Sequence, residues 1–298
     1  MNPWVRATTA ATRLLVLLAV LTLAWQLRRG FLAFKGESLT FSPPRGPISP
    51  PTDATEIRLS PVTFSAKRDV VLNGWYLASL DGTGIVLAHG SGATRVSMLD
   101  EARILAGAGH GVLLFDFPGH GESQGMVEFG TPARDAVVAG VDFLSSRPEI
   151  NQRRLGALGF SDGGIAVAAA AAADRRIRAV ALVATPADAK RQTVNEYRAF
   201  GPIAVLGAVL AYRVRAVHLE RMRAEADVAA IAPHPLAIFG GRQDGVVHLD
   251  EALHLYASAH EPKQLFVVEH GDHGAYARTD TAYARELRQF FASSLRSR

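Results

Sequence analysis

The sequence contains no cysteine, and this absence removes several kinds of chemistry. Without thiols the chain cannot form disulfides, attack a substrate through sulfur or hold zinc by thiolates, while its compartment stays open. Aromatic residues make up only 8% of the chain, basic residues do not alternate with them, and no nucleic-acid motif is present. The formal net charge is +4, so a surface for anionic lipid fits this chain better than one for DNA, and we expect no nucleic-acid partner.

One long apolar run stands out near the N-terminus. Leu14–Leu27 is uncharged, and extended back to Ala7 it reaches about 20 residues, enough to cross a bilayer if the Arg13 side chain snorkels. We therefore expect residues 1–35 to be an uncleaved, single-pass membrane anchor. The alternatives are a cleaved signal peptide and a buried helix of a soluble protein; against cleavage, the run is followed by Arg28-Arg29 and not by a small-x-small site. Basic residues flank both ends of the run, so the side of the membrane stays undecided.

The remaining chain passes from a proline-rich segment to a regular alternation. Residues 36–55 are expected to form a stiff, extended linker, and residues 56–298 one domain in which apolar strands alternate with helices. This alternation predicts an α/β fold with a mostly parallel central sheet flanked by helices. Strands are expected at Ile57–Phe64 and Val70–Ala78 (an antiparallel pair), Gly84–Ala88, Gly111–Phe115, Arg154–Leu158, Ile177–Ala184, Leu236–Phe239 and Gln264–Val268. Helices are expected at Arg95–Ala108, Thr131–Ser146 (Thr131 as cap), Ile165–Ala173, Leu249–Ser258 and from Thr279.

One connection, at about residues 186–234 after the sixth strand, is far too long to join a strand to a helix. It contains the very apolar stretch Phe200–Tyr212, followed by several arginines. We expect a helical cap over the active site, because long insertions in compact domains tend to be lids. The alternatives are an ordinary helix packed on the sheet and a basic, apolar segment that touches the bilayer.

The segment Gly159-Phe-Ser161-Asp-Gly163 has the pattern Gly-x-Ser-x-Gly between a short strand and a run of strong helix formers. In such a turn the glycines permit strained geometry and close approach of strand and helix, and the seryl oxygen is exposed to a base. We therefore predict that Ser161 is a nucleophile. The N-terminus of the following helix offers free N–H groups to a developing oxyanion.

A nucleophilic serine needs a base and an orienting acid, and both follow later strands. Asp244 comes after Leu236–Phe239, and His273 lies in a glycine-flanked loop after Gln264–Val268. Since catalytic groups in open parallel sheets gather beyond the carboxyl ends of strands, Ser161, Asp244 and His273 are expected at one edge. His270 as the base, and Asp250 or Asp272 as the acid, fit this arrangement less well.

Two backbone N–H groups are expected to form the oxyanion hole. One belongs to Ser91, in the loop after the third strand, and the other to Asp162, directly after the nucleophile. The loop Asp116–Ser123 after the fourth strand is interpreted as scaffold that shapes the pocket, and His120 within it as a structural residue.

These motifs together resemble the α/β-hydrolase superfamily from about Glu56 to Arg298. The N-terminal run and Leu72–Tyr76 are similar to membrane-anchored serine hydrolases of the monoacylglycerol-lipase, serine-aminopeptidase and acyl-protein-thioesterase kind. Asp162 departs from the pattern, because relatives often carry an uncharged residue there; its carboxylate suits a helix N-terminus but disfavours strongly anionic substrates. The matching segments are His89-Gly-Ser-Gly92, Asp116–Ser123, Gly159–Gly164, Asp244 and His273.

The expected function is hydrolysis of esters, thioesters or similar acyl compounds through an acyl-enzyme, with no metal or organic cofactor. The expected partners are a small acyl ester or lipid-like substrate and a membrane, reached through the N-terminal helix. Acyl transfer or peptide cleavage on the same scaffold, and a catalytically idle binding domain, are the alternatives. The sequence leaves the oligomeric state undecided.

Overall fold

The computed structural model describes residues 3–49 and 57–296. Within these ranges the chain forms two compact units. The first joins the N-terminal helix, up to Leu39, to the segment Thr193–His218. The second contains Thr40–Gln192 and the residues from Leu219 onward, and it holds the sheet.

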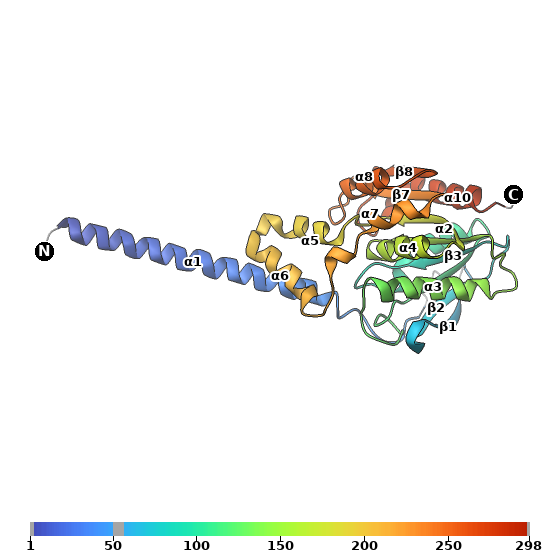
Figure 1. The fold of residues 1–298 in the computed structure, drawn as a ribbon, viewed down its shortest axis with the longest axis horizontal. Helices are drawn as coiled ribbons and strands as arrows, with labels where there is room; N and C mark the ends of the chain where they lie inside the picture. Colours follow the sequence, from blue (N-terminus) through green and yellow to red (C-terminus); the bar gives the residue numbers. More distant parts are fainter. Residues whose placement is uncertain (1–2, 50–56, 297–298) are drawn as a thin grey trace. The chain divides into compact units, whose positions relative to one another are not determined.

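An eight-stranded sheet forms the centre of the second unit (Figure 1). The order of its strands is β1-β2-β4-β3-β5-β6-β7-β8. β2 pairs antiparallel with β1 and β4, and all other neighbours are parallel. The mostly parallel α/β sheet expected from the sequence is confirmed. The strands are β1 (Ser60–Ser65), β2 (Val71–Leu77), β3 (Gly84–Ala88), β4 (Gly111–Phe115), β5 (Leu155–Phe160), β6 (Ile177–Val183), β7 (Leu236–Gly241) and β8 (Lys263–Val268).

The helices that flank the sheet lie close to their expected positions, with two differences. The helix predicted from Arg95 is split into a 3₁₀ turn and an α-helix. Thr131 is the first residue of α3 and not its cap, because Gly130 takes the cap position with a φ of +67°. In this unit the flanking elements are η2 (Lys67–Asp69), η3 (Arg95–Met98), α2 (Leu99–Ala106), α3 (Thr131–Ser145), α4 (Asp162–Ala173), α8 (Leu249–Ser258), α9 (Tyr276–Thr279) and α10 (Thr281–Ser294).

The central strands are covered on both faces. β3 and β4 are fully buried, as their unbroken apolar sequences predict for a parallel sheet. Ile85 and Leu87 share a core cluster with residues of α2 and α10, whereas Val86 lies against Gly140 of α3. Because successive strand residues point to opposite faces, α2 and α10 cover one face of the sheet and α3 covers the other.

The long connection between β6 and β7 is helical, and it divides between the two units. Its most apolar helix, α6, packs on α1: Ala204 and Ala208 form a small buried cluster with Ala33. The helical insertion expected after the sixth strand is therefore present, and its role as a lid stays a prediction. Its elements are α5 (Ala189–Tyr197), η4 (Arg198–Phe200), α6 (Pro202–Arg213), η5 (Leu219–Arg221), α7 (Ala224–Asp227) and η6 (Val228–Ile231).

The N-terminal helix α1 spans Pro3–Leu39 without interruption, so the first residues assigned to the linker are helical. Among the described residues, only Thr12–Leu39 is long and apolar enough to cross a bilayer, a criterion that a signal sequence also meets.

The described part of the proline-rich linker is not simply a free spacer. The Gly121 N–H donates to the Pro44 carbonyl at 3.0 Å, and the Gly46 N–H donates to the Gly121 carbonyl at 3.2 Å. This stretch is thereby fastened to the loop after β4. Residues 50–56 of the expected linker lie outside the described residues.

Candidate active site

The predicted site residues all follow strands that end at one edge of the sheet. Ser91 comes after β3, Ser161 and Asp162 after β5, Asp244 after β7 and His273 after β8. The strands from β3 to β8 pair in parallel, so their carboxyl ends meet at this edge.

Ser161 occupies a strained turn between β5 and α4. Its φ of +53° and ψ of −129° are unusual for a residue with a Cβ. The turn requires glycine on both sides, because a Cβ on Gly159 would collide with the backbone of α4 and one on Gly163 with the carbonyls that end β3. Its hydrogen bonds, from the Ser161 N–H to the Val183 carbonyl at 2.9 Å and from the Gly164 N–H to the Ser161 carbonyl at 2.9 Å, hold this geometry.

Asp244 and His273 form a hydrogen-bonded pair, with His273 Nδ1 2.9 Å from Asp244 Oδ2. The carboxylate is fully buried and also accepts from the N–H groups of Val246 and Val247. Burial favours a raised pKa for Asp244, but the hydrogen bond and charge of His273, together with these two N–H donors, outweigh it and lower the pKa. Asp244 is thus held as an anion that fixes one nitrogen of the imidazole.

The loop that carries His273 lies against the residue before Ser161. The ring centroids of His273 and Phe160 are 4.8 Å apart, and a Cβ built on Gly274 would lie 3.9 Å from the Phe160 ring. The His273 N–H donates to Asp272 Oδ1 at 2.8 Å, so Asp272 shapes this loop while Asp244 binds the ring. The predicted base, His273, and the serine turn are therefore packed together.

The Ser91 loop also approaches the serine turn. A Cβ built on Gly90 would lie 3.0 Å from the Ser161 Cβ, so the backbone of this loop passes directly beside the serine. Asp162 is the first residue of α4, where N–H groups have no acceptor within the helix. Burial raises the pKa of the Asp162 carboxyl, while a hydrogen bond from the Ser91 side chain and the charge of His273 oppose the rise. The two residues expected to donate to an oxyanion are thus joined through their side chains.

A second polar group occupies the same edge, after β4. Asp116 is fully buried and pairs with the buried Arg95, whose guanidinium also pairs with Glu122 and lies 4.6 Å from the Trp75 ring centroid. The His89 ring Nε2 accepts from the Phe117 N–H at 3.0 Å. These contacts fasten the Ser91 loop to the loop after β4, in agreement with its interpretation as scaffold.

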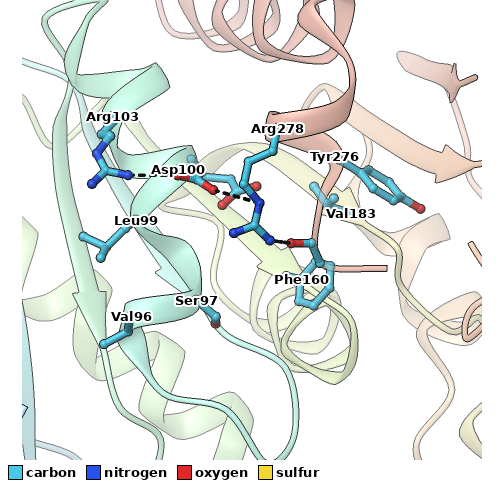
Figure 2. A pocket seen from close by; sticks show the side chains of 11 residues that line it. Val96, Ser97, Leu99, Asp100, Arg103, Phe160, Val183, Tyr276 and Arg278 are labelled. Atoms are coloured by element: carbon cyan, nitrogen blue, oxygen red, sulfur yellow. Dashed lines mark hydrogen bonds and ion pairs between the residues drawn. The ribbon is translucent and has the colours of Figure 1, made fainter. Parts of the chain in front are cut away.

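Two pockets adjoin the serine turn through its chain neighbours. One, of about 480 Å³, is bordered by Phe160 and Gly274 and carries the charged side chains Asp100 and Arg278 (Figure 2). Arg278 points toward Asp100, with Nε and Oδ2 3.8 Å apart, and donates to the Gly274 carbonyl at 2.8 Å. The other pocket, of about 170 Å³, is lined by Asp162 and by α3 and α4. Ser161 and His273 do not line either pocket, so both pockets lie beside the serine turn.

Within residues 3–49 and 57–296, no group of three or more His, Asp and Glu side chains is arranged to hold a metal.

Sequence reasoning missed Tyr276. Its hydroxyl donates to Asp244 Oδ2 at 2.9 Å and accepts from the Gly241 N–H at 2.6 Å. Burial, followed by the nearby charge of Asp244, raises the pKa of Tyr276, so the phenol keeps its proton and remains a donor. The signal available in the sequence was a tyrosine three residues after the proposed base.

The sheet order, the turn at Ser161 and the Asp–His pair define an α/β-hydrolase-fold protein. Comparison with family models makes the assignment narrower: the model of the prolyl oligopeptidase family matches residues 97–298. This match covers more than half of the chain, and the chain belongs to that family.

The chain is similar in sequence to proteins of other organisms and in structure to a solved esterase. The uncharacterized protein YfhR of Salmonella typhi is 28% identical over 239 residues, 71% of this chain and 73% of that protein. Thiohydrolase aneE of Aspergillus aculeatus is 33% identical over 134 residues, 43% of this chain and 42% of that protein. The solved structure of the Pyrococcus furiosus esterase PF2001 superposes with a TM-score of 0.70 at 22% identity, covering 85% of this chain and 97% of that one, and so shares the fold.

Proposed function

We propose that the protein is a serine hydrolase that cleaves ester or thioester bonds of acyl substrates through an acyl-enzyme. The observation that carries this proposal is the hydrogen-bonded pair of Asp244 and His273, packed through Phe160 against the strained turn at Ser161. Nucleophile, base and orienting acid are the three groups that such catalysis requires.

The reaction follows from the roles of the two imidazole nitrogens. Because Nδ1 of His273 donates to Asp244, Nε2 is the nitrogen that takes the proton from Ser161 Oγ as this oxygen attacks the substrate carbonyl. The N–H groups of Ser91 and Asp162 stabilise the oxyanion, and losing one such donor typically costs about 10²–10³ in rate. His273 then gives its proton to the departing alcohol or thiol. Water, deprotonated by the same nitrogen, releases the carboxylic acid.

A small acyl ester or thioester is the substrate class that we favour. The matched proteins named as an esterase and a thiohydrolase support this choice. Peptide cleavage is the second candidate, supported by the description of the family as prolyl oligopeptidases. A panel of p-nitrophenyl esters, acyl thioesters and aminoacyl-p-nitroanilides, compared by kcat/KM, separates the two, and acyl transfer is detected by analysing products in the presence of alcohols.

We further propose that α1 remains attached and anchors the protein in a membrane. Its length and the apolar stretch Thr12–Leu39 support this, as does Arg28-Arg29 where a signal peptide would have a cleavage site. Edman sequencing of the membrane-extracted protein distinguishes an anchor, which retains residues 1–35, from a cleaved signal.

Labelling by a fluorophosphonate probe tests the nucleophile. The wild-type protein should be labelled, and Ser161→Ala should not. Ser91→Ala is the matched control: it removes a second serine beside the turn but keeps its backbone N–H, so labelling should persist. Equal labelling of Ser161→Ala would assign the nucleophile elsewhere. Absence of both labelling and turnover in the wild type would favour a catalytically idle binding domain.

A further inference from the structure

The first compact unit differs in charge from the rest of the chain. Its two segments, Met1–Leu39 and Thr193–His218, contain eight Arg and Lys residues and two Glu residues, a formal charge of +6. The remaining sequence contains 24 Arg and Lys and 26 Asp and Glu residues, a formal charge of −2. The mildly basic character of the protein therefore comes entirely from the unit that holds the apolar N-terminal helix.

Within this unit α6 packs beside the C-terminal part of α1 (Figure 1). The contact uses small residues: a Cβ on Gly207 would collide with the Gly30 carbonyl, and Ala204 and Ala208 are buried with Ala33. Close packing of backbones through small residues such as glycine and alanine is common where helices associate in bilayers.

Contacts at the two ends of α6 fix its direction. At its N-terminal end, Arg29 Nη1 of α1 donates to the Phe200 carbonyl at 3.2 Å. At its C-terminal end, the Tyr212 hydroxyl donates to Glu37 Oε2 at 2.6 Å. The beginning of α6 therefore lies level with the end of the apolar run of α1, and its C-terminal end lies further from that run.

An arginine between two aromatic rings marks the level where α6 begins. The Arg29 Cζ lies 3.5 Å from the Trp25 ring centroid and 5.5 Å from that of Phe200. Tryptophan and arginine at the end of an apolar run are typical of the bilayer–water interface. Arg28, which precedes Arg29, and Arg198, two residues before Phe200, are exposed. Surface arginines of this kind attract anionic headgroups.

The face of α6 that does not contact α1 is apolar and exposed. Leu206 is 64% exposed, Leu210 46% and Val214 59%, in a stripe with a spacing of one helical turn. Phe200, 47% exposed, precedes this stripe. With 12 residues, α6 is too short to span a bilayer, which takes about 20. An exposed apolar face on a short, basic element fits the interface of one leaflet.

We propose that Phe200 and the N-terminal half of α6 lie in the headgroup region of the leaflet where the apolar run of α1 ends, and that Arg28, Arg29 and Arg198 bind the phosphates of anionic phospholipids there. This inference rests on the proposed anchor. It assigns a second membrane contact to the insertion after β6. The helix α6 points away from the apolar run of α1. Labels along its exposed stripe should therefore lie less deep in the bilayer from Leu206 to Val214, a distance of about 12 Å along the helix at 1.5 Å per residue.

The absence of cysteine provides the test, because each single-cysteine variant carries one thiol. The full-length protein is reconstituted into nanodiscs of phosphatidylcholine with phosphatidylglycerol and labelled with bimane at Leu17→Cys, Leu206→Cys or Val214→Cys. Leu253→Cys, an exposed leucine of α8, is the matched control from the other unit. Quenching by a headgroup-region nitroxide lipid is compared with quenching by aqueous iodide.

The Leu206 label should show a several-fold higher ratio of lipid to iodide quenching than Val214 and Leu253, and Leu17 should be protected from iodide. If the label at Leu17 lies in lipid and the label at Leu206 lies in water, the proposed role of α6 is wrong and the proposed anchor is retained. If the label at Leu17 lies in water, both proposals are wrong. Lipid quenching of Leu253 equal to that of Leu206 also contradicts a specific role for α6.

A second comparison tests the arginines. The lipid quenching of Leu206 should fall in discs of phosphatidylcholine alone, and it should fall likewise in anionic discs when Arg28→Gln and Arg198→Gln are introduced. Arg213→Gln, at the C-terminal end of α6, is the control and should leave the signal unchanged. If neither the lipid exchange nor the double variant changes the signal, no anionic lipid is bound.

Discussion

Two loops at the same edge of the sheet each hold a buried aspartate beside a histidine-bearing segment, but the two histidines are hydrogen-bonded differently. Asp244 accepts from Nδ1 of His273, and the ring, with a side-chain exposure of 19%, retains a second nitrogen that this carboxylate does not bind. In the other loop Asp116 pairs with Arg95, while His89 uses both ring nitrogens for backbone groups, the Phe117 N–H and the Gly90 carbonyl. A buried histidine whose two ring nitrogens both bind backbone groups has a structural role. A partly exposed histidine that binds a carboxylate through one nitrogen can act as a base through the other.

The largest effect is expected at Asp244, because we propose this carboxylate as the acid that orients His273. Asp244→Asn should lower kcat by about 10⁴-fold, since an amide stabilises the wrong imidazole tautomer. The cleavage of p-nitrophenyl esters by folded protein, verified by circular dichroism, measures this. Asp250→Asn, in the adjacent helix, is the matched control and should keep its activity. Comparable losses in both variants would show that the acid is assigned incorrectly.

Substitutions that disturb the second loop, which holds Asp116, should lower the free energy of unfolding. Arg95→Met leaves the fully buried Asp116 without its guanidinium, and removing one partner of a buried pair typically costs about 3–5 kcal/mol of unfolding free energy. Urea unfolding measures it, and adding Asp116→Asn should recover part of the loss because no unpaired charge then remains. A variant that unfolds like the wild type but loses activity would place Arg95 in the catalytic machinery instead.

The two loops also differ in how much of each can be predicted from sequence. The strands, their order in the chain and the residues at their ends follow from apolar runs and turn residues, so the sequence alone brings Ser161, Asp244 and His273 to one edge. The partners of the second loop do not follow in this way, because Arg95 and Asp116 are separated by a helix and a strand, and their pairing depends on tertiary packing. The association of α6 with α1 was equally hidden, since it depends on the small residues Gly30 and Gly207 meeting across distant segments.

His89 in the second loop should make the stability of the protein depend on pH. Burial, with a contribution from His120, lowers the pKa of His89 to about 3, so the folded protein keeps the ring neutral while the unfolded chain binds a proton below its ordinary pKa. The contribution of the neutral His89 to the free energy of unfolding is therefore complete above about pH 6.5, and it is lost as the pH falls toward 3. In His89→Gln the amide can satisfy both backbone groups and does not titrate. When the pH falls from 6.5 to 4.5, the free energy of unfolding of this variant should therefore decrease by about 2–3 kcal/mol less than that of the wild type. Parallel urea titrations at these two pH values provide the measurement, and equal losses for both proteins would mean that His89 is not held neutral.

The smallest effect is expected at Tyr276, which refines the contrast within the Asp244 loop itself. Tyr276→Phe removes a donor to Asp244 Oδ2, the oxygen that also accepts from His273, and a hydrogen bond of about 1–1.5 kcal/mol corresponds to about a tenfold loss in kcat. KM should remain unchanged. A carboxylate with one donor fewer stabilises a protonated imidazole more strongly, so the low-pH limb of the kcat/KM profile should also move to higher pH. Tyr283→Phe, a buried tyrosine that donates to Glu101 and not to Asp244, serves as the control and should leave this limb in place. An unshifted limb in Tyr276→Phe, whatever its rate, would show that the tyrosine packs against Asp244 without tuning its interaction with His273.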